Sequence, residues 1–151
     1  MSWSARLAEL GWVLPPVVTP VGVYVPAVRS GSLVFTSGQL PLVDGVLAAT
    51  GKLGAEIGTE QGRQLARICA LNALAAVDGL VGLDAVIRVV KVVGFVASAP
   101  GFTAQPSVLN GASALLGELF GPAGAHARSA IGVIELPLGA PVEVELVVEV
   151  L

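Results

Sequence analysis

The amino-acid sequence predicts an α+β fold in which two helices cover one face of a mixed β-sheet. Two segments, residues 60–80 and 106–120, carry apolar residues at helical spacing. Segments rich in β-branched residues precede, separate and follow them. The last segment, residues 142–150, alternates aliphatic residues with glutamates at first, as a half-buried strand does. The resulting order of strands, helix, strand, helix and two strands fits a single domain of 151 residues.

The N-terminal part is expected to hold a short helix and a first hairpin. Residues 4–11 are predicted to form the helix, which Gly11 ends. Three prolines then indicate an extended connector. Two β-rich runs, residues 24–28 and 33–37, follow as strands, with residues 29–32 as the turn between them.

A second hairpin and the first long helix are predicted next. Asp44-Gly45 lies between two apolar runs in residues 40–49 and is a strong signal for a two-residue turn. Thr59 is the expected N-cap of a helix over residues 60–80, and a pair of glycines ends that helix.

The C-terminal half is predicted to contain a strand, a helix and two further strands. Residues 87–97 are rich in valine, which favours strands. The helix over residues 106–120 stops at Gly121-Pro122. Residues 127–135 and 142–150 then form the last two strands.

The composition indicates an oligomer and disfavours nucleic acid as a partner. Apolar residues make up 54% of the chain and charged residues only 13%, so few charges remain to cover the surface of a small domain. We therefore expect apolar surface to be buried against another subunit; the alternative is a monomer with an exterior rich in Ala and Val. The net charge is −3 and the eight basic residues are scattered, which gives no patch for phosphates.

Single cysteine and histidine residues limit the chemistry that one chain can carry. Cys69 has no partner for an intrachain disulfide, and His126 alone excludes a site with several histidines, so we expect no metal and no cofactor. Glu9 falls where a signal peptide needs an apolar core. No run of about eighteen apolar residues lacks a charge, so we expect no membrane span and a cytoplasmic location.

Arg128 is the most informative polar residue, because the usual catalytic motifs are missing. The sequence has no Gly-x-Ser-x-Gly elbow, phosphate-binding loop or dinucleotide-binding glycine pattern. Arg128 opens an otherwise apolar strand, where a guanidinium needs a partner and a planar carboxylate suits it. That partner is either a glutamate of the chain, as a structural ion pair, or the carboxylate of a ligand. The residues alone favour the ion pair.

Other polar residues have simpler interpretations. Ser37 is interpreted as a strand-end hydroxyl that bonds to backbone. Glu143 and Glu145 lie on one face of the last strand. We expect this face to be solvated, so that at least one of the two carboxylates is exposed to water. Cys69 is expected in the core, and His126 at the end of a surface loop.

Two segments together resemble the Rid/YjgF family, also called the RidA or L-PSP endoribonuclease family. The first is Tyr24 to Val28 followed by the stretch LVFTSGQLP, which begins at Leu33. The second is Arg128 with its strand, the pair Leu136-Pro137 and the acidic and aliphatic alternation from Val142. The match extends from Val21 to the C-terminus. The first twenty residues and the phrase GFVASAPGF, residues 94–102, resemble a distinct, longer branch of the family.

The resemblance implies a fold, an assembly and an activity. The fold is chorismate-mutase-like, with residues 1–151 as one domain and residues 1–20 as an N-terminal extension. The assembly is a homotrimer with sites in clefts between subunits. The activity is hydrolysis of reactive 2-imino acids, or their enamine tautomers, to 2-oxo acids and ammonia, so the implied ligand is a small carboxylate.

The resemblance also assigns the site residues. Arg128 matches the arginine that grips the substrate carboxylate, and Glu143 matches the glutamate associated with the attacking water. Ala130 occupies the place of a cysteine common in the deaminase branch. If that cysteine contributes only backbone groups, alanine can substitute for it; if its side chain shapes the pocket, the substrate differs. The remaining cleft positions are matched by Tyr24, Ser37, Gly38 and Asn110.

A mechanism without a strong nucleophile is sufficient for this reaction. Protonated imines are already electrophilic, so positioning by Arg128 and a water held near Glu143 are enough. Two other functions stay open. One is a non-catalytic protein that binds small carboxylates or a regulatory partner. The other, endoribonuclease activity, is the least favoured because the chain has no basic patch and no pair of histidines.

Overall fold

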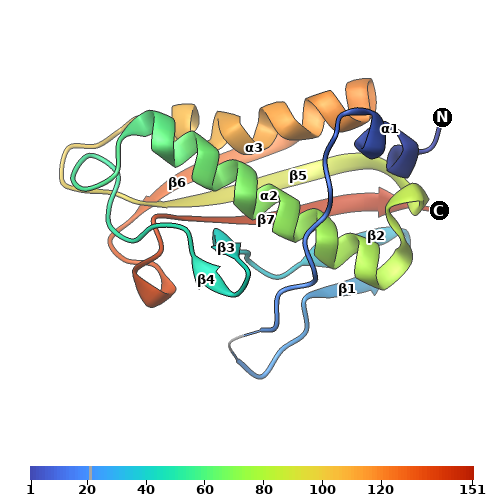
Figure 1. Ribbon diagram of the computed structural model, residues 1–151, viewed down its shortest axis with the longest axis horizontal. Helices are drawn as coiled ribbons and strands as arrows, with labels where there is room; N and C mark the ends of the chain where they lie inside the picture. Colours follow the sequence, from blue (N-terminus) through green and yellow to red (C-terminus); the bar gives the residue numbers. More distant parts are fainter. Residues whose placement is uncertain (21) are drawn as a thin grey trace.

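A five-stranded mixed sheet with two helices on one face is the centre of the computed structural model, which describes residues 1–20 and 22–151 (Figure 1). Its order is β1-β2-β7-β5-β6, made of β1 (Ala27–Ser30), β2 (Leu33–Thr36), β7 (Val142–Val150), β5 (Val86–Ala97) and β6 (Ala127–Val133). Strands β5 and β6 are parallel, and the other neighbours are antiparallel. This confirms the predicted α+β class with a mixed sheet. Val21, where the family resemblance begins, lies outside the described residues.

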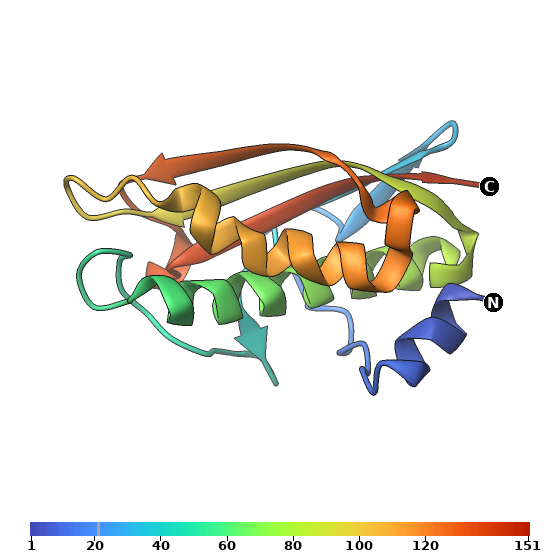
Figure 2. The same ribbon diagram turned by 90° about the horizontal axis from the view of Figure 1, so that it is seen from above.

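Two long helices, α2 (Thr59–Val81) and α3 (Gln105–Phe120), lie side by side over the same face of the sheet (Figure 2). Two glycines determine how closely these layers approach. A Cβ at Gly111 of α3 would lie 2.0 Å from the backbone oxygen of Arg63 in α2. A Cβ at Gly94 of β5 would lie 2.0 Å from Leu109 Cδ1 of α3. Any side chain at either position would force the layers apart.

Strand β7 lies in the middle of the sheet and follows the predicted alternation. Val142, Val144, Leu146, Val148 and Val150 are buried against the helices, and the residues between them are half-buried on the opposite face. The period of two thus fixes which residues face the helices and which leave the sheet on its other side.

Helix α2 is long and apolar enough to span a membrane by length and composition, but it packs in the core of the domain against α3 and β7. In its most apolar window 56% of the residues are buried inside the protein. Cys69 on this helix is fully buried, as expected for core packing, and burial raises the pKa of its thiol well above the usual range. The cytoplasmic location stays a prediction.

The N-terminal extension is firmly docked. Helix α1 (Trp3–Glu9) begins after the cap Ser2, whose hydroxyl accepts from Ala5 N, and Gly11 follows it with a φ of 74°. Trp3 Nε1 donates to the carbonyl oxygen of Val86 at 2.7 Å, and the Trp3 ring meets Phe120 edge-on at 5.0 Å. The predicted helix is confirmed, and these contacts attach it to the first residue of β5 and the last residue of α3.

The small elements complete the layout. Strands β3 (Leu42–Val43) and β4 (Val46–Leu47) form the second hairpin, and Asp44 and Gly45 both have positive φ, as a two-residue turn of this kind requires. Three short 3-10 helices are η1 (Leu83–Ala85), η2 (Gly121–Gly124) and η3 (Pro137–Gly139).

Several predicted boundaries were wrong for local reasons. Thr59 is the first residue of α2, and Gly58 is the N-cap, with no side-chain capping bond. The first hairpin turn is shorter than predicted, because Arg29 and Ser30 both pair with β2. Strand β1 begins at Ala27 because Pro26 has no N–H to donate to a sheet. Strand β6 ends at Val133, two residues early.

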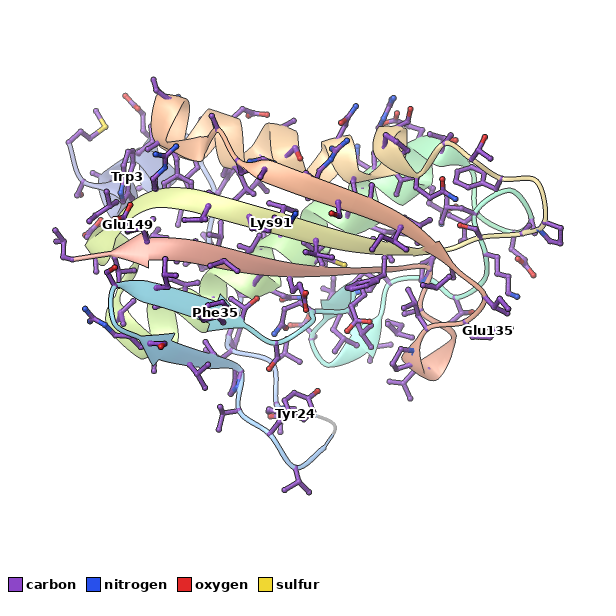
Figure 3. All side chains as sticks on the ribbon, turned by 180° about the vertical axis from the view of Figure 1, so that it is seen from behind. Trp3, Tyr24, Phe35, Lys91, Glu135 and Glu149 are labelled. Carbon is purple, nitrogen blue, oxygen red and sulfur yellow. The ribbon has the colours of Figure 1, made fainter. Side chains whose placement is uncertain are left out.

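The face of the sheet away from the helices carries exposed apolar side chains. Figure 3 shows this face, with Phe35 of β2 and Lys91 of β5 labelled on it. Val28, Phe35 and Ile131 are 50%, 40% and 43% exposed. Apolar side chains gathered on one face of a sheet are typical of a contact surface, and both the oligomer and the trimer stay predictions.

Candidate functional site

Arg128 lies on edge strand β6 and points toward α3. It pairs with Val92 of β5, which is fully buried on the helix side of the sheet. Its Nη1 donates to Asn110 Oδ1 at 2.8 Å and to Ser113 Oγ at 3.2 Å, and its Nη2 donates to the carbonyl oxygen of Pro106 at 3.4 Å. Three neutral acceptors on one side of α3 therefore hold the guanidinium in place.

The structural ion pair that the residues alone favour is not formed in the described part of the chain. Salt bridges there join Arg6 to Glu9, Lys52 to Glu135 and Arg63 to Glu60, and none includes Arg128. Of the five N–H groups of Arg128, three are used by α3, and Nε makes no hydrogen bond to the described residues. Nε–H and one Nη2–H remain, on the edge of the guanidinium that binds a carboxylate through two parallel hydrogen bonds.

Asn110 and Ala130 lie next to Arg128, as the family resemblance implies. Asn110 accepts from the guanidinium directly. Ala130 is two residues further along β6 on the same side, pairs with Gly94 and packs against the edge of the hydrophobic core. The outer edge of β6 has no neighbouring strand in the sheet of the described residues. Backbone groups on that edge are therefore available to a ligand beside Arg128.

Glu143 leaves the sheet on the opposite face. It pairs with Phe95, whereas its neighbours Val142 and Val144 are fully buried against the helices. The side chain is half-buried, and this burial, followed by the nearby charge of Glu145, raises its pKa above the usual range. The face is thus only partly solvated at Glu143, whose carboxyl binds a proton more readily than an exposed one.

Gly38 gives the Glu143 carboxyl its space. A Cβ at Gly38 would lie 2.1 Å from Glu143 Oε1 and 2.8 Å from its carboxyl carbon. Only glycine allows the carboxyl to rest against the backbone here. The two residues, assigned to one site by the resemblance, are thus in direct contact.

Ser37 and Tyr24 adjoin the same cluster. The Ser37 hydroxyl donates to the carbonyl oxygen of Val25 at 2.6 Å, as its simple interpretation predicts, and Ser37 N donates to that of Pro26 at 2.8 Å. These bonds fix the loop that carries Tyr24, which is 48% exposed (Figure 3). Tyr24 and Gly38 line a small pocket together with Val18, Thr19 and Pro20 of the N-terminal extension.

The predicted site residues form two clusters that one chain does not bring together. Arg128, Asn110 and Ala130 lie on the helix side of β6. Tyr24, Ser37, Gly38 and Glu143 lie on the other side of β5 in the sheet order, around the end of β2 and the start of β7. Arg128 pairs with Val92 of β5, and Glu143 pairs with Phe95 of the same strand. Val92 and Phe95 are three residues apart, so their side chains, and those of their partners, leave the sheet on opposite faces. A site that uses both clusters therefore needs a second chain.

Sequence reasoning missed two parts of the site. Ser113 was not singled out, although it lies three residues after Asn110 and hence on the same side of α3. The wall formed by residues 18–20 was also missed, because its contacts with Tyr24 and Gly38 are not visible in any local pattern. In the described residues no group of three or more His, Cys, Asp or Glu side chains is arranged to hold a metal ion.

Comparisons with known proteins agree with the resemblance. A family model described as "YjgF/chorismate mutase-like, putative endoribonuclease" matches residues 4–150. Protein TCP17 of Trypanosoma cruzi is 46% identical over 148 residues, which are 97% of this chain and 92% of that protein. Protein Atu1372 of Agrobacterium tumefaciens, described as having unknown function, is 41% identical with a TM-score of 0.90, covering 98% of this chain and 92% of that one.

A more distant structure shares the fold alone. Escherichia coli TdcF, solved with bound serine, is 24% identical with a TM-score of 0.67, over 88% of this chain and 92% of that one. The family model, by contrast, spans almost the entire chain. The chain therefore belongs to the YjgF/chorismate mutase-like family.

Proposed function

We propose that the protein hydrolyses reactive 2-imino acids, or their enamine tautomers, to 2-oxo acids and ammonia in a cleft between two subunits. The observation that carries the proposal is Arg128, a guanidinium held by neutral acceptors with its Nε and one Nη2 hydrogen left over. A half-buried guanidinium with N–H groups left over is suited to bind an anion. A planar carboxylate on a small ligand fits there with two parallel hydrogen bonds.

Glu143 has the properties that the chemistry requires. Water adds to the C=N carbon of the protonated imine while the Glu143 carboxylate takes one of its protons. The protonated carboxyl then returns that proton to the amine nitrogen. As the C–N bond breaks, the Glu143 carboxylate takes the hydroxyl proton of the adduct, which leaves a C=O bond in the 2-oxo acid, and the departing ammonia carries that proton away as ammonium. A carboxyl whose pKa is raised by burial is suited to these proton transfers. No cofactor takes part in these steps.

The proposal includes a homotrimer, as the family resemblance implies. The two clusters lie on opposite faces of one sheet, so a site that uses both draws on a second subunit. Arg128 of one subunit and Glu143 of the next would face each other across the cleft. The exposed apolar sheet face, with Val28, Phe35 and Ile131, is the surface we assign to subunit contacts. In a closed three-fold arrangement every interface is the same, so each interface joins Arg128 of one subunit to Glu143 of the next and forms one site.

The test is release of 2-oxo acid and ammonia from freshly generated 2-iminopropanoate or 2-iminobutanoate. We expect the wild type to accelerate release and Arg128→Ala to lower kcat/KM by about 10²–10⁴-fold, as loss of two charge-assisted hydrogen bonds implies. Arg6→Ala on α1 is the matched control and should keep full activity. An inactive wild type, or a fully active Arg128→Ala variant, would overturn the proposal for these substrates.

The same variants separate the alternatives. Ala130 in place of the family cysteine favours a non-catalytic carboxylate-binding protein, for which calorimetry would show 2-oxo acid binding that depends on Arg128 without turnover. RNA cleavage by highly purified protein, lost in Arg128→Ala, would instead support the ribonuclease activity in the family description.

A further inference from the structure

His126 is tied to Arg128 through Ser113. His126 lies at the end of the loop before β6, as the sequence predicts, and it is half-buried there. Its Nε2 lies 2.9 Å from Ser113 Oγ, and its Nδ1 lies 2.6 Å from the carbonyl oxygen of Gly124. Ser113 Oγ in turn lies 3.2 Å from Arg128 Nη1. The four residues therefore form one hydrogen-bonded chain from a backbone carbonyl to the guanidinium.

The direction of each bond in this chain follows from the chemistry of its ends. A carbonyl oxygen only accepts, so the proton of the neutral His126 ring is on Nδ1 and is donated to Gly124. His126 Nε2 is then an acceptor and takes the hydroxyl proton of Ser113. The Ser113 oxygen keeps its lone pairs for Arg128 Nη1–H. Every donor and acceptor in the chain is thereby matched.

The far end of the chain is rigid. Gly124 is buried in η2, and a Cβ on it would lie 2.3 Å from the backbone oxygen of Leu116 in α3. Its carbonyl is therefore fixed by close contact between backbone segments. Ser113 and Asn110 together occupy both hydrogens of Arg128 Nη1. A guanidinium held in this way by Nη1 cannot rotate about its Cζ–Nε bond without breaking both bonds.

We propose that Ser113 and His126 are positioning residues that hold the Arg128 guanidinium with its Nε and Nη2 edge directed to the carboxylate of the substrate. This rests on the proposed function, in which Arg128 binds that carboxylate. Neither residue touches the reacting atoms. Their effect is to orient the arginine before the ligand arrives, which lowers the cost of ordering a long side chain on binding.

The experiment compares Ser113→Ala and His126→Phe with the rescuing variant Ser113→Thr, which keeps a hydroxyl. Ser107→Ala is the matched control, because the Ser107 hydroxyl on the same helix makes no hydrogen bond to the described residues. Two quantities are measured: the rotation rate of the Arg128 guanidinium by ¹⁵N NMR, and KM and kcat for 2-iminobutanoate. Melting temperatures show that each variant is folded.

We expect Ser113→Ala and His126→Phe each to accelerate guanidinium rotation and to raise KM by about tenfold, with kcat changed by less than about twofold. The double variant should resemble either single one, because both act through one chain of bonds. Ser113→Thr and Ser107→Ala should behave as wild type. Unchanged rotation in both Ser113→Ala and His126→Phe, or additive effects, would overturn the inference. If rotation responds as expected while the wild type neither binds nor hydrolyses imino acids, the proposed function fails and the positioning role stands.

Discussion

Gly38→Ala adds one methyl group next to Glu143 and should displace the Glu143 carboxyl from its catalytic position. The new Cβ would lie 2.1 Å from Glu143 Oε1, whereas ordinary contact begins near 3.4 Å, so the carboxyl oxygen must move by about 1.3 Å. A misplacement of about 1 Å in a catalytic group costs roughly 100-fold in rate. We therefore expect kcat for 2-iminobutanoate to fall about 100-fold.

Stability should change little in this variant. The backbone of Gly38 is outside the left-handed region, and the displaced group is the flexible end of a half-exposed side chain. We expect a loss of about 1 kcal/mol or less in the free energy of unfolding. The matched control is Gly117→Ala on α3, where a Cβ meets nothing within 4 Å; it should keep full activity and gain about 0.8–1.0 kcal/mol from helix propensity.

Steady-state kinetics and thermal unfolding of Gly38→Ala, Glu143→Gln and the double variant test this reasoning. Because both substitutions act through the same carboxyl, the double variant should be no slower than the slower single variant. Full kcat in Gly38→Ala would show that the position of the Glu143 carboxyl does not matter to the reaction. Additive losses would show that Gly38 acts by another route.

Three further predictions concern stability and pH. Gly94→Ala places a Cβ 2.0 Å from Leu109 Cδ1 inside the core and should cost about 1–3 kcal/mol of unfolding free energy; an unchanged melting temperature would contradict the tight β5–α3 packing. Trp3→Phe removes the bond to Val86 O and should cost about 1 kcal/mol in chemical denaturation, with no effect if α1 is not docked. The raised pKa of Glu143 means that, between the unfolded pKa and the higher folded pKa, the folded state holds more protons than the unfolded one, so stability falls as pH rises through this window. Glu143→Gln should flatten that fall in melting temperature, and an identical pH profile would refute it.

The sheet and both long helices could be predicted because their patterns are local. The alternation in β7 repeats every two residues, and its buried and half-buried positions in the structure follow it without a break. Asp44-Gly45 produced the expected turn because its conformation depends only on those two residues. The boundaries were less predictable. Thr59 was chosen as the N-cap because its hydroxyl can cap a helix, but Gly58 takes that place without a side-chain bond.

The site was only partly predictable, because its contacts join segments far apart in the sequence. The family resemblance identified Arg128 and Glu143, but the residues alone favoured an ion pair for the arginine that is not formed in the described part of the chain. Nothing in the sequence places the two residues on opposite faces of the sheet, since that depends on the register of β5 with β6 and β7. The Ser113–His126 connection likewise appears only when α3 and β6 are packed together.

The N-terminal extension illustrates the same limit. Its helix was predictable from local pattern, but its path was not, because Ser4 bonds to Asp84 and Trp12 stacks on Arg67 across long sequence separations. These contacts position the segment after the helix so that its last residues, 18–20, line the pocket beside Tyr24 and Gly38. The extension is therefore a structural part of the domain and forms one wall next to the Glu143 cluster.

Subunit mixing tests most directly the central claim that Arg128 of one subunit and Glu143 of another hydrolyse 2-imino acids together. Arg128→Ala and Glu143→Gln are each expected to be nearly inactive alone. Refolded together in equal amounts, they should regain about one quarter of the wild-type activity, because a random closed assembly pairs an intact arginine with an intact glutamate at that frequency. No recovery in mixed assemblies that contain both variants would contradict the shared site, and full activity of Arg128→Ala alone would contradict its role as the carboxylate anchor.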